Sequence, residues 1–517
     1  MPSGSWLRAA DVATATLVAC ATFLVHDVGY VLSRPYWLDE AWVAATSRAR
    51  LGLLPWLTQT TPLGWIALIR VVPYEGQRYR LVPLCFAAGA AVAAYLLGNH
   101  LRLVRIFGPA LAAAGVLLLP AMLVRDDLKQ YTTEAFATLI LMVLVARTES
   151  HWSRRRLAAL GASASLGLLF TNTTAFVGVA GMAALGLDVT LRRQWRRLAE
   201  VIGLGGAMVA AMSVIYLVVD ARHKSSLVTG AFGSYYMPTG PRQALSFLHG
   251  RADAIAPYLG FHHPVLPLVL AGAGIVTMWV DDHRALALTT PFIIIMAAVA
   301  SAYRAFPFLD LRTSTFWLAA VGALMGIGAA GIVTRLARLN RPLAAVALVG
   351  TVIAWSVMTW PYVRAHPLPN EDVASQVTYL NRHIRPGDVT IVDLGASYAF
   401  AYYERRLQPA FAPSPVIAIR WRPTFPHTPS VIAMSDRQAT DVDSALRTAE
   451  GMVGRGATVW IVRSHLAAAP VEAAAWSQAL AGLAVKSLDV GPEPLLRFQP
   501  GLDQAGVSAA QQQQGGV

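Results

Sequence analysis

The chain has 517 residues, of which 55% are hydrophobic and 14% are charged, and its formal net charge is +13. A soluble globular protein carries about a quarter charged residues, so this composition excludes an ordinary soluble domain and indicates a polytopic membrane protein. The basic residues are almost all arginines that lie between apolar runs. That distribution argues against a nucleic-acid-binding domain and is typical of membrane topology and contact with anionic lipid.

Apolar runs of membrane-spanning length recur through the first 362 residues. They begin near Ala9, Arg80, Val104, Glu134, Leu157, Thr173, Glu200, Pro264, Ala285, Thr313 and Pro342. Because about 20 apolar residues cross a bilayer as a helix, we expect an α-helical polytopic protein with about eleven transmembrane helices. Residues 171–174 interrupt the run that starts at Leu157, and we expect two helices there.

The arginine-rich loops predict how these helices are oriented. Loops 147–156 and 192–197 are the densest in arginine, and a pair of helices between them places both loops on one side. Basic residues concentrate on the cytoplasmic face, so we expect the N-terminus inside. The longer outer loops then cover residues 33–79, 121–133, 220–263 and 303–312.

The character of the chain changes after Pro361, where charges and turn residues return. Short β-rich runs alternate with helix-like segments at residues 442–452 and 471–483; the runs cover residues 389–394, 416–419, 431–434 and 458–462. This alternation predicts a small α/β domain. We therefore expect a membrane domain over residues 1–362, an extracytoplasmic α/β domain over 363–505 and a disordered tail over 506–517.

Two adjacent carboxylates, Asp39 and Glu40, follow the first apolar run and emerge on the expected outer side. A carboxylate at the membrane surface can accept a proton from a hydroxyl as that hydroxyl attacks the anomeric carbon of a sugar. The other interpretation is that the acidic pair favours the first turn of a following helix. The sequence is compatible with both roles of the acidic pair.

The second outer loop concentrates acids and bases immediately before the fourth apolar run. Lys129 is one of three lysines in the whole chain, and a compact ammonium suits a phosphate group. A salt-bridged loop with an acid near the helix N-terminus is the alternative. Two acid-rich loops on one face favour a functional site, whose candidate residues here are Arg125, Asp126, Asp127, Lys129, Tyr131 and Glu134.

The last outer loop adds aromatic residues around two arginines, Arg304 and Arg312. Arg312 precedes the tenth apolar run and is placed to bind a lipid phosphate, because a guanidinium makes bidentate contacts with phosphate oxygens. A partner role with Asp310 is equally compatible with the sequence. We treat Arg304 and Arg312 as candidate substrate-binding residues.

Some functional classes have no support in the sequence. There is no Walker-type phosphate loop and no glycine fingerprint between a strand and a helix, which argues against ATP-driven transport and a nucleotide-sugar site. The acids lie outside the apolar runs, which argues against a proton-coupled transporter.

These motifs resemble the polytopic GT-C glycosyltransferases, a group that includes protein O-mannosyltransferases, lipid A aminoarabinose transferases and actinobacterial cell-wall arabinosyltransferases. The layout covers most of the first 360 residues, and the resemblance is carried by residues 37–40, 61–65, 80–83, 129–131 and 303–312. Two departures are present. The family's paired prolines appear as Thr61-Pro62, and the proline of the late loop is displaced.

The resemblance implies inverting transfer from a polyprenyl-phosphate sugar to an envelope glycan, lipid or protein on the outer face of a bacterial plasma membrane. It implies Asp39 as the general base, with Glu40 orienting either Asp39 or the acceptor, and Asp126 or Asp127 as a second-loop acid. Lys129 and Arg312 would hold the donor phosphate. Some members bind a divalent ion at these acids, so a requirement for Mg or Mn stays open. The rival hypotheses are a lipid-linked-sugar flippase and a non-catalytic membrane assembly protein.

Overall fold

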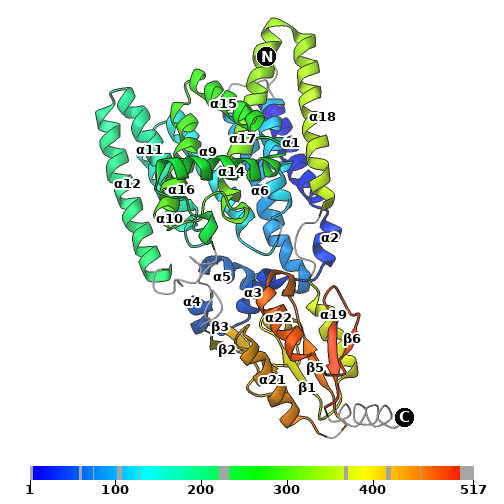
Figure 1. Ribbon diagram of the computed structural model, residues 1–517. Helices are drawn as coiled ribbons and strands as arrows, with labels where there is room; N and C mark the ends of the chain where they lie inside the picture. The colour runs from blue at the N-terminus through cyan, green and yellow to red at the C-terminus, as the bar shows by residue number, and fades with distance from the viewer. Residues whose placement is uncertain are drawn as a thin grey trace, which may run out of the picture. The chain divides into compact units, whose positions relative to one another are not determined.

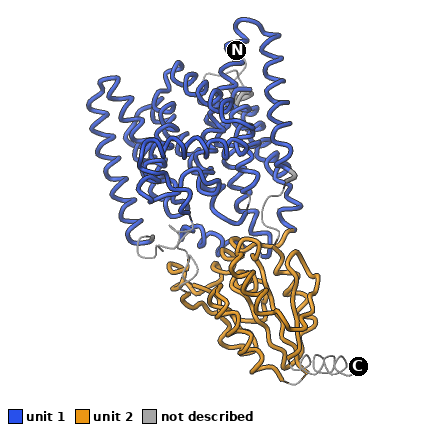
Figure 2. The backbone as a smooth tube through the Cα atoms, in the orientation of Figure 1, with its two compact units in different colours: residues 1–33, 60–224, 229–367 blue, residues 34–59, 225–228, 368–517 orange. Residues whose placement is uncertain are grey.

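The computed structural model describes residues 4–57, 61–73, 75–101, 107–125, 127–220, 232–365, 371–414, 421–454 and 456–500. The chain forms two compact units (Figure 2). Unit 1 consists of Met1–Ser33, Thr60–Lys224 and Thr229–Pro367. Unit 2 consists of Arg34–Gln59, Ser225–Val228 and Leu368–Val517, so the segment with Asp39 and Glu40 belongs to the same unit as the C-terminal residues.

Unit 1 is built of helices (Figure 1), and each apolar run predicted from the sequence forms one of them. The elements are α1 (Gly4–Val25), α2 (Val28–Ser33), α5 (Leu63–Val71), η2 (Gly76–Arg80), α6 (Leu81–His100), α7 (Phe107–Leu117), α8 (Pro120–Leu123), α9 (Tyr131–Ser150), α10 (Arg154–Gly167), α11 (Thr174–Leu191), α12 (Trp195–Ile215), η3 (Tyr216–Asp220), η4 (Gly233–Tyr235), α14 (Pro241–Ile255), η5 (Ala256–Leu259), α15 (Val265–Val280), α16 (Arg284–Ala302), α17 (Leu311–Leu339) and α18 (Arg341–Ala365).

Within the described residues, 7 helices are long and apolar enough to cross a membrane. They cover Gly76–His100, Tyr131–Ser150, Thr174–Leu191, Trp195–Val219, Arg284–Ala302, Leu311–Leu339 and Arg341–Val363. Shorter apolar helices occupy Ala9–Val25, Phe107–Leu117 and Val265–Val280. The predicted break between α10 and α11 is confirmed, and the fold is that of a polytopic membrane protein.

Helix α17 lies at the centre of unit 1 and is almost entirely buried. Glycines allow its neighbours to approach closely. A methyl group on Gly322 would collide with the carbonyl of Gly115 in α7, and one on Gly328 would collide with the carbonyl of Leu270 in α15. Small residues at such crossings are characteristic of membrane helices, where close packing replaces the hydrophobic driving force.

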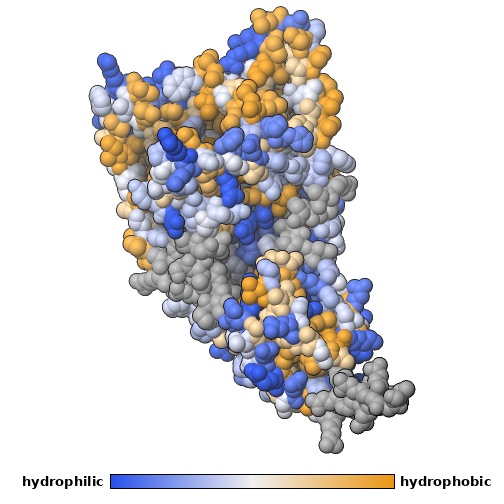
Figure 3. Space-filling view, in the orientation of Figure 1, coloured by the Kyte–Doolittle hydropathy of each residue, from blue (hydrophilic) through white to orange (hydrophobic). Residues whose placement is uncertain are grey.

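Helices α12 and α18 present most of their apolar side chains outward. Figure 3 shows hydrophobic residues gathered on the exposed side of α18 in particular. The exposed members there include Val346, Val349, Ile353, Val357 and Trp360. An apolar exposed surface of this length is explained by contact with lipid tails rather than water.

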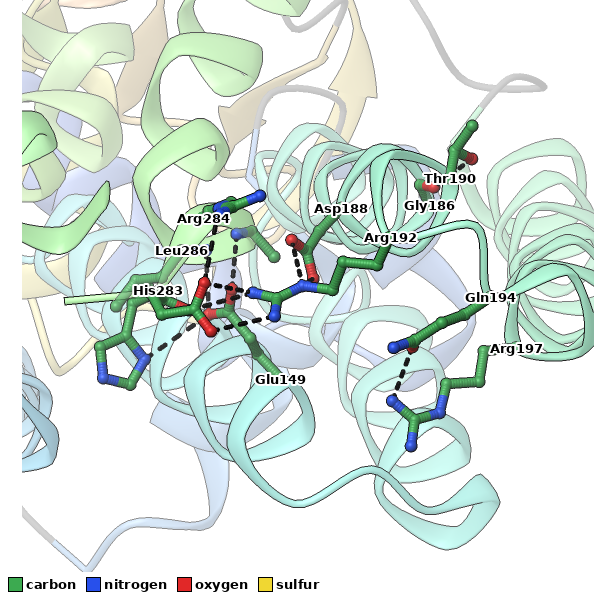
Figure 4. Close-up of polar contacts among 12 residues, drawn as sticks. Glu149, Gly186, Asp188, Thr190, Arg192, Gln194, Arg197, His283, Arg284 and Leu286 are labelled. Carbon is green, nitrogen blue, oxygen red and sulfur yellow. Dashed lines mark hydrogen bonds and ion pairs between the residues drawn. The ribbon is translucent and has the colours of Figure 1, made fainter. Parts of the chain in front are cut away.

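Charged side chains connect helix ends within unit 1 (Figure 4). Glu149 at the end of α9 accepts hydrogen bonds from the backbone N–H groups of Ala285 (2.7 Å) and Leu286 (3.4 Å) at the start of α16. Arg192 bonds both Asp188 and Asp282 at 2.9 Å. The hydrogen bond from Arg192 holds the pKa of the Asp282 carboxyl below its usual range. These contacts satisfy N–H and charged groups that a helix end would otherwise leave open.

Unit 2 contains a small mixed sheet with helices around it. Its elements are α3 (Leu38–Ser47), η1 (Leu51–Leu53), α4 (Leu54–Leu57), α19 (Val373–His383), β1 (Val389–Val392), α20 (Ser397–Tyr403), β2 (Ala410–Pro413), β3 (Trp421–Thr424), β4 (Val431–Ala433), α21 (Ala439–Met452), β5 (Val459–Val462), η6 (Leu466–Ala468), α22 (Pro470–Ala479), β6 (Lys486–Leu488) and β7 (Leu495–Phe498). The sheet order is β4-β1-β5-β7-β6, and β2 and β3 form a separate antiparallel pair.

The predicted α/β alternation is confirmed in the described part of unit 2. Strands β4, β1 and β5 run parallel, and β7 pairs antiparallel with β5. Ile391 and Ile461 belong to one core with residues of α21 and α22, whereas Trp460 on the alternate face lies against Tyr379 of α19. The strand predicted at residues 416–419 falls outside the described residues.

We expect Gly322→Val to lower the free energy of unfolding by about 2 kcal/mol or more, because the new side chain must displace the α7 backbone. Gly350→Val on α18 is the matched control, since a Cβ there would meet nothing within 4 Å apart from its chain neighbours and its own helix backbone. Thermal unfolding of the detergent-solubilised protein measures both. Equal melting temperatures for the two variants would contradict the close α7–α17 crossing.

Candidate functional site

The adjacent acids Asp39 and Glu40 lie in the first turn of α3. Glu40 is completely buried, and its carboxylate lies 3.6 Å from the guanidinium of Arg34. Asp39 is half-buried. The pair therefore does occupy a helix N-terminus, as one sequence interpretation expected, but its members differ. Glu40 is held in an ion pair, and Asp39 is the more accessible carboxylate.

The start of α3 is held by residues far away in the chain. The Leu38 N–H donates a hydrogen bond of 2.8 Å to one carboxylate oxygen of Glu371. The other oxygen lies 2.6 Å from Nδ1 of His465. His465 follows β5, and Asp393 follows β1 with its carboxylate accepting from the Ser464 N–H. Polar residues thus gather outside the carboxyl ends of parallel strands, where open α/β sheets commonly place functional groups.

Tyrosines of α20 secure the same segment. The Tyr36 N–H donates to the hydroxyl of Tyr403 at 2.7 Å, and the rings of Tyr36 and Tyr402 meet edge to face at 5.4 Å. Arg48 stacks over the Tyr402 ring at 4.0 Å and donates to its carbonyl oxygen at 3.1 Å. Contacts on both sides of α3 therefore restrict how this helix moves within unit 2.

The imidazole of His465 is electrostatically coupled to this turn. Burial lowers the pKa of His465, but its hydrogen bond to Glu371 and the charges of Glu371 and Asp39 outweigh burial, so the pKa lies above its ordinary value. Sequence reasoning missed both Glu371 and His465. The sequence signal for His465 was its position shortly after the apolar run at residues 458–462. The sequence offered no signal for Glu371.

The second candidate loop lies in unit 1, and its described part combines both sequence interpretations. Helix α9 begins at Tyr131, with Glu134 in its first turn. Arg125 lies 3.7 Å from the carboxylate of Asp127 and 5.7 Å from the centre of the Tyr131 ring. Lys129 and Glu134 are both only 4% exposed. Asp126 falls outside the described residues. The loop is therefore partly salt-bridged, and it also buries an ammonium group.

Three of the motifs behind the GT-C resemblance are linked by contacts within unit 1. The Thr132 hydroxyl next to Tyr131 donates to the carbonyl of Pro83 at 2.8 Å. Arg80, fully buried, donates to the carbonyl of Val31 at 2.7 Å. Trp65 contacts Phe86 in α6 with ring centres 6.0 Å apart, and Phe86 in turn contacts α9. The segments 61–65, 80–83 and 129–131 are thus joined through α6 and the start of α9.

The two arginines of the last candidate loop differ in their contacts and in their exposure. Arg312 lies 3.6 Å from the carboxylate of Asp310, which also caps α17 by accepting from the Thr313 N–H at 3.2 Å. The guanidinium lies 5.1 Å from the centre of the Phe232 ring. Arg304 is exposed in a left-handed turn with φ of 55°. Pairing of Arg312 with Asp310 is therefore observed, and Arg312 is the more enclosed of the two arginines.

The candidate residues divide between the two units. Asp39 and Glu40 belong to unit 2, whereas Arg125, Asp127, Lys129, Tyr131, Glu134, Arg304 and Arg312 belong to unit 1. Among the residues that the structure describes, no group of three or more His, Cys, Asp or Glu side chains has an arrangement that would hold a metal ion.

No protein-family model and no curated protein sequence matches the chain. Among solved structures, the fold is that of the GT-C membrane glycosyltransferases, which confirms the predicted resemblance at the level of fold. ArnT from Cupriavidus metallidurans, bound to undecaprenyl phosphate, matches with a TM-score of 0.55 and 13% identity over 96% of this chain and 98% of that chain. The oligosaccharyltransferase of Archaeoglobus fulgidus, solved with zinc and sulfate, matches with a TM-score of 0.53 and 12% identity over 87% of this chain and 67% of that chain.

Arg34→Ala should destabilise unit 2 by about 3 kcal/mol, because it removes a partner of the completely buried Glu40 carboxylate. Arg50→Ala, at an exposed arginine of the same segment, is the control and should be nearly neutral. Chemical unfolding followed by fluorescence reports the difference. A neutral Arg34→Ala would show that the Arg34–Glu40 pair does not support the turn.

Proposed function

We propose that this chain is an inverting glycosyltransferase that moves a sugar from a polyprenyl-phosphate donor to an acceptor of the cell envelope. The observation that carries the proposal is the GT-C fold, which extends over nearly the whole chain and nearly the whole of ArnT. The half-buried carboxylate of Asp39, on a helix turn secured from two sides, supports it at the level of chemistry.

In the proposed step, a hydroxyl oxygen of the acceptor attacks the anomeric carbon of the donor sugar. Asp39 accepts the hydroxyl proton as the new carbon–oxygen bond forms. The bond between the anomeric carbon and the phosphate oxygen breaks, and polyprenyl phosphate leaves with that electron pair. Attack from the side opposite the phosphate inverts the anomeric configuration. Glu40, held by Arg34, acts by keeping the turn in place.

The donor is assigned to the lipid-linked class on two grounds. ArnT, which shares the fold, was solved bound to undecaprenyl phosphate. In this chain Lys129 supplies a compact ammonium in the same loop as Arg125, and both kinds of cation bind phosphate groups. We assign Lys129 to the donor phosphate together with Arg125, and Tyr131 and Glu134 to the walls of the same site. Arg312 and Arg304 are assigned to more peripheral phosphate contacts.

We propose the extracytoplasmic face of a bacterial plasma membrane as the location of the acceptor. The basis is the arginine distribution, which concentrates in loops 147–156 and 192–197 and marks the cytoplasmic side. An envelope glycan, lipid or protein is reachable there, and the lipid donor enters sideways from the bilayer.

We expect Asp39→Asn to reduce turnover by about 10²- to 10⁴-fold, because an amide cannot accept the hydroxyl proton. The assay offers a panel of polyprenyl-phosphate sugars and an envelope acceptor extract to the purified protein, and it measures released polyprenyl phosphate. Asp443→Asn, at an exposed site on α21, is the matched control. Unchanged turnover in folded Asp39→Asn would refute the assignment of Asp39, and a wild type that neither turns over nor binds any donor would favour the transport or assembly hypotheses.

Lys129→Gln should weaken donor binding by about 10- to 100-fold, since a hydrogen bond to a charged group contributes about 1.5–3 kcal/mol. The turnover number at saturating donor should change much less, because Lys129 is assigned to binding rather than to proton transfer. Lys486→Gln, at an exposed lysine of β6, controls for the loss of charge. Equal donor affinity in both variants would remove Lys129 from the phosphate site.

A further inference from the structure

Helix α3 lacks a cap of its own. Its N-cap residue is Trp37, whose side chain makes no capping hydrogen bond. The first N–H groups of a helix have no partner within the helix. Here the Leu38 N–H donates to the Glu371 carboxylate at 2.8 Å, so a residue far along the chain acts as the cap. A negative charge at this position also interacts favourably with the helix dipole.

Glu371 is itself held in place from two directions. The next residue, Asp372, caps α19 by accepting from the N–H of Ser375 at 2.9 Å and from its hydroxyl at 2.6 Å. The second oxygen of Glu371 contacts His465 Nδ1 at 2.6 Å, and both side chains are mostly buried. His465 has φ of 66°, an uncommon conformation for a non-glycine residue that persists only where surrounding contacts determine it.

Charged groups from several elements face the imidazole of His465. Glu371 and Asp39 favour its protonated form, whereas Arg437 after β4 opposes it. Glu472 of α22 also interacts with it electrostatically. The imidazole therefore contacts the capping carboxylate and interacts electrostatically with the candidate base, within a cluster of mixed charge.

From these contacts we infer that Glu371 and His465 are a positioning pair for Asp39. Glu371 caps the turn that carries Asp39, and His465 keeps the Glu371 carboxylate aimed at the Leu38 N–H. Asp39 is the residue directly after Leu38, so a shift of this turn moves the carboxylate that accepts the proton. The inference rests on the proposed function, since it gives the C-terminal residues of unit 2 a role in that reaction. Neither member of the pair needs to touch the substrate.

Glu371→Ala and Glu371→Gln test the cap in the full-length purified protein. We expect the alanine variant to lose about 100-fold in kcat, which is the order of effect of displacing a catalytic group by about 1 Å. The glutamine oxygen still accepts from the Leu38 N–H, so this variant should recover most of the loss. The KM for donor should stay close to the wild-type value in both. Glu450→Ala, at an exposed glutamate of α21, is the control.

His465→Gln tests the second member of the positioning pair through the dependence of kcat on pH. The pKa of His465 is raised in the folded protein, so its contribution is complete below the ordinary histidine pKa of about 6.5 and is lost as pH rises through the raised value. We expect wild-type kcat to fall over that alkaline range and the fall to be absent in His465→Gln. His427→Gln, at an exposed histidine, should retain the wild-type profile.

Amide hydrogen exchange of residues 36–42, read together with kcat, distinguishes failure of the positioning pair from failure of the proposed function. Faster exchange in Glu371→Ala than in Glu371→Gln, together with the kcat losses, would support the positioning pair. Wild-type kcat and pH profile in folded Glu371→Ala and His465→Gln would overturn the pair and leave the transferase proposal standing. A wild type that neither turns over nor binds any donor would overturn the proposed function, and the positioning role with it. Should Glu371→Ala not fold, Glu371→Gln and His465→Gln carry the test.

Discussion

The peptide groups of a chain inside a bilayer have no water to hydrogen-bond, and this constraint governs unit 1. Its long apolar helices satisfy their own backbone, so packing between them depends on close contact at glycines such as Gly115 and Gly322. Ionisable side chains then bind the backbone and charged groups at helix ends. Glu149 caps α16 from α9, and Arg192 joins the ends of two helices. The candidate site residues of unit 1 accordingly lie in loops or in the first turns of α9 and α17.

The same need to satisfy helix ends explains how Asp39 is held. Helix α3 is short and begins without a capping side chain, so its first N–H groups depend on the rest of unit 2. Glu371 supplies the acceptor, and Tyr403 holds the preceding residue Tyr36. In the proposed reaction, a carboxylate on a turn that is restrained in this way is preorganised to accept the proton, which reduces the reorganisation needed.

The charged candidate residues differ in burial and in ion pairing. Glu40 is paired with Arg34, and Asp127 with Arg125, so these acids contribute to local structure whatever their further roles. Asp39 is half-buried and Lys129 is buried. In the proposed reaction these two residues have complementary tasks: one accepts a proton, and the other binds a phosphate anion.

Sequence alone determined the helical membrane fold, the helix breaks and the α/β character of the C-terminal residues, because hydrophobic periodicity and length are local properties. It also identified Asp39 and Lys129 as candidates. Only the tertiary structure revealed that residues 34–59 belong to unit 2, that Glu40 is paired with Arg34, and that Glu371 and His465 meet at the start of α3. Leu38 and Glu371 lie 333 residues apart, and Glu371 and His465 lie 94 residues apart. Each pair is joined by a single polar contact, which leaves no periodic pattern in one sequence.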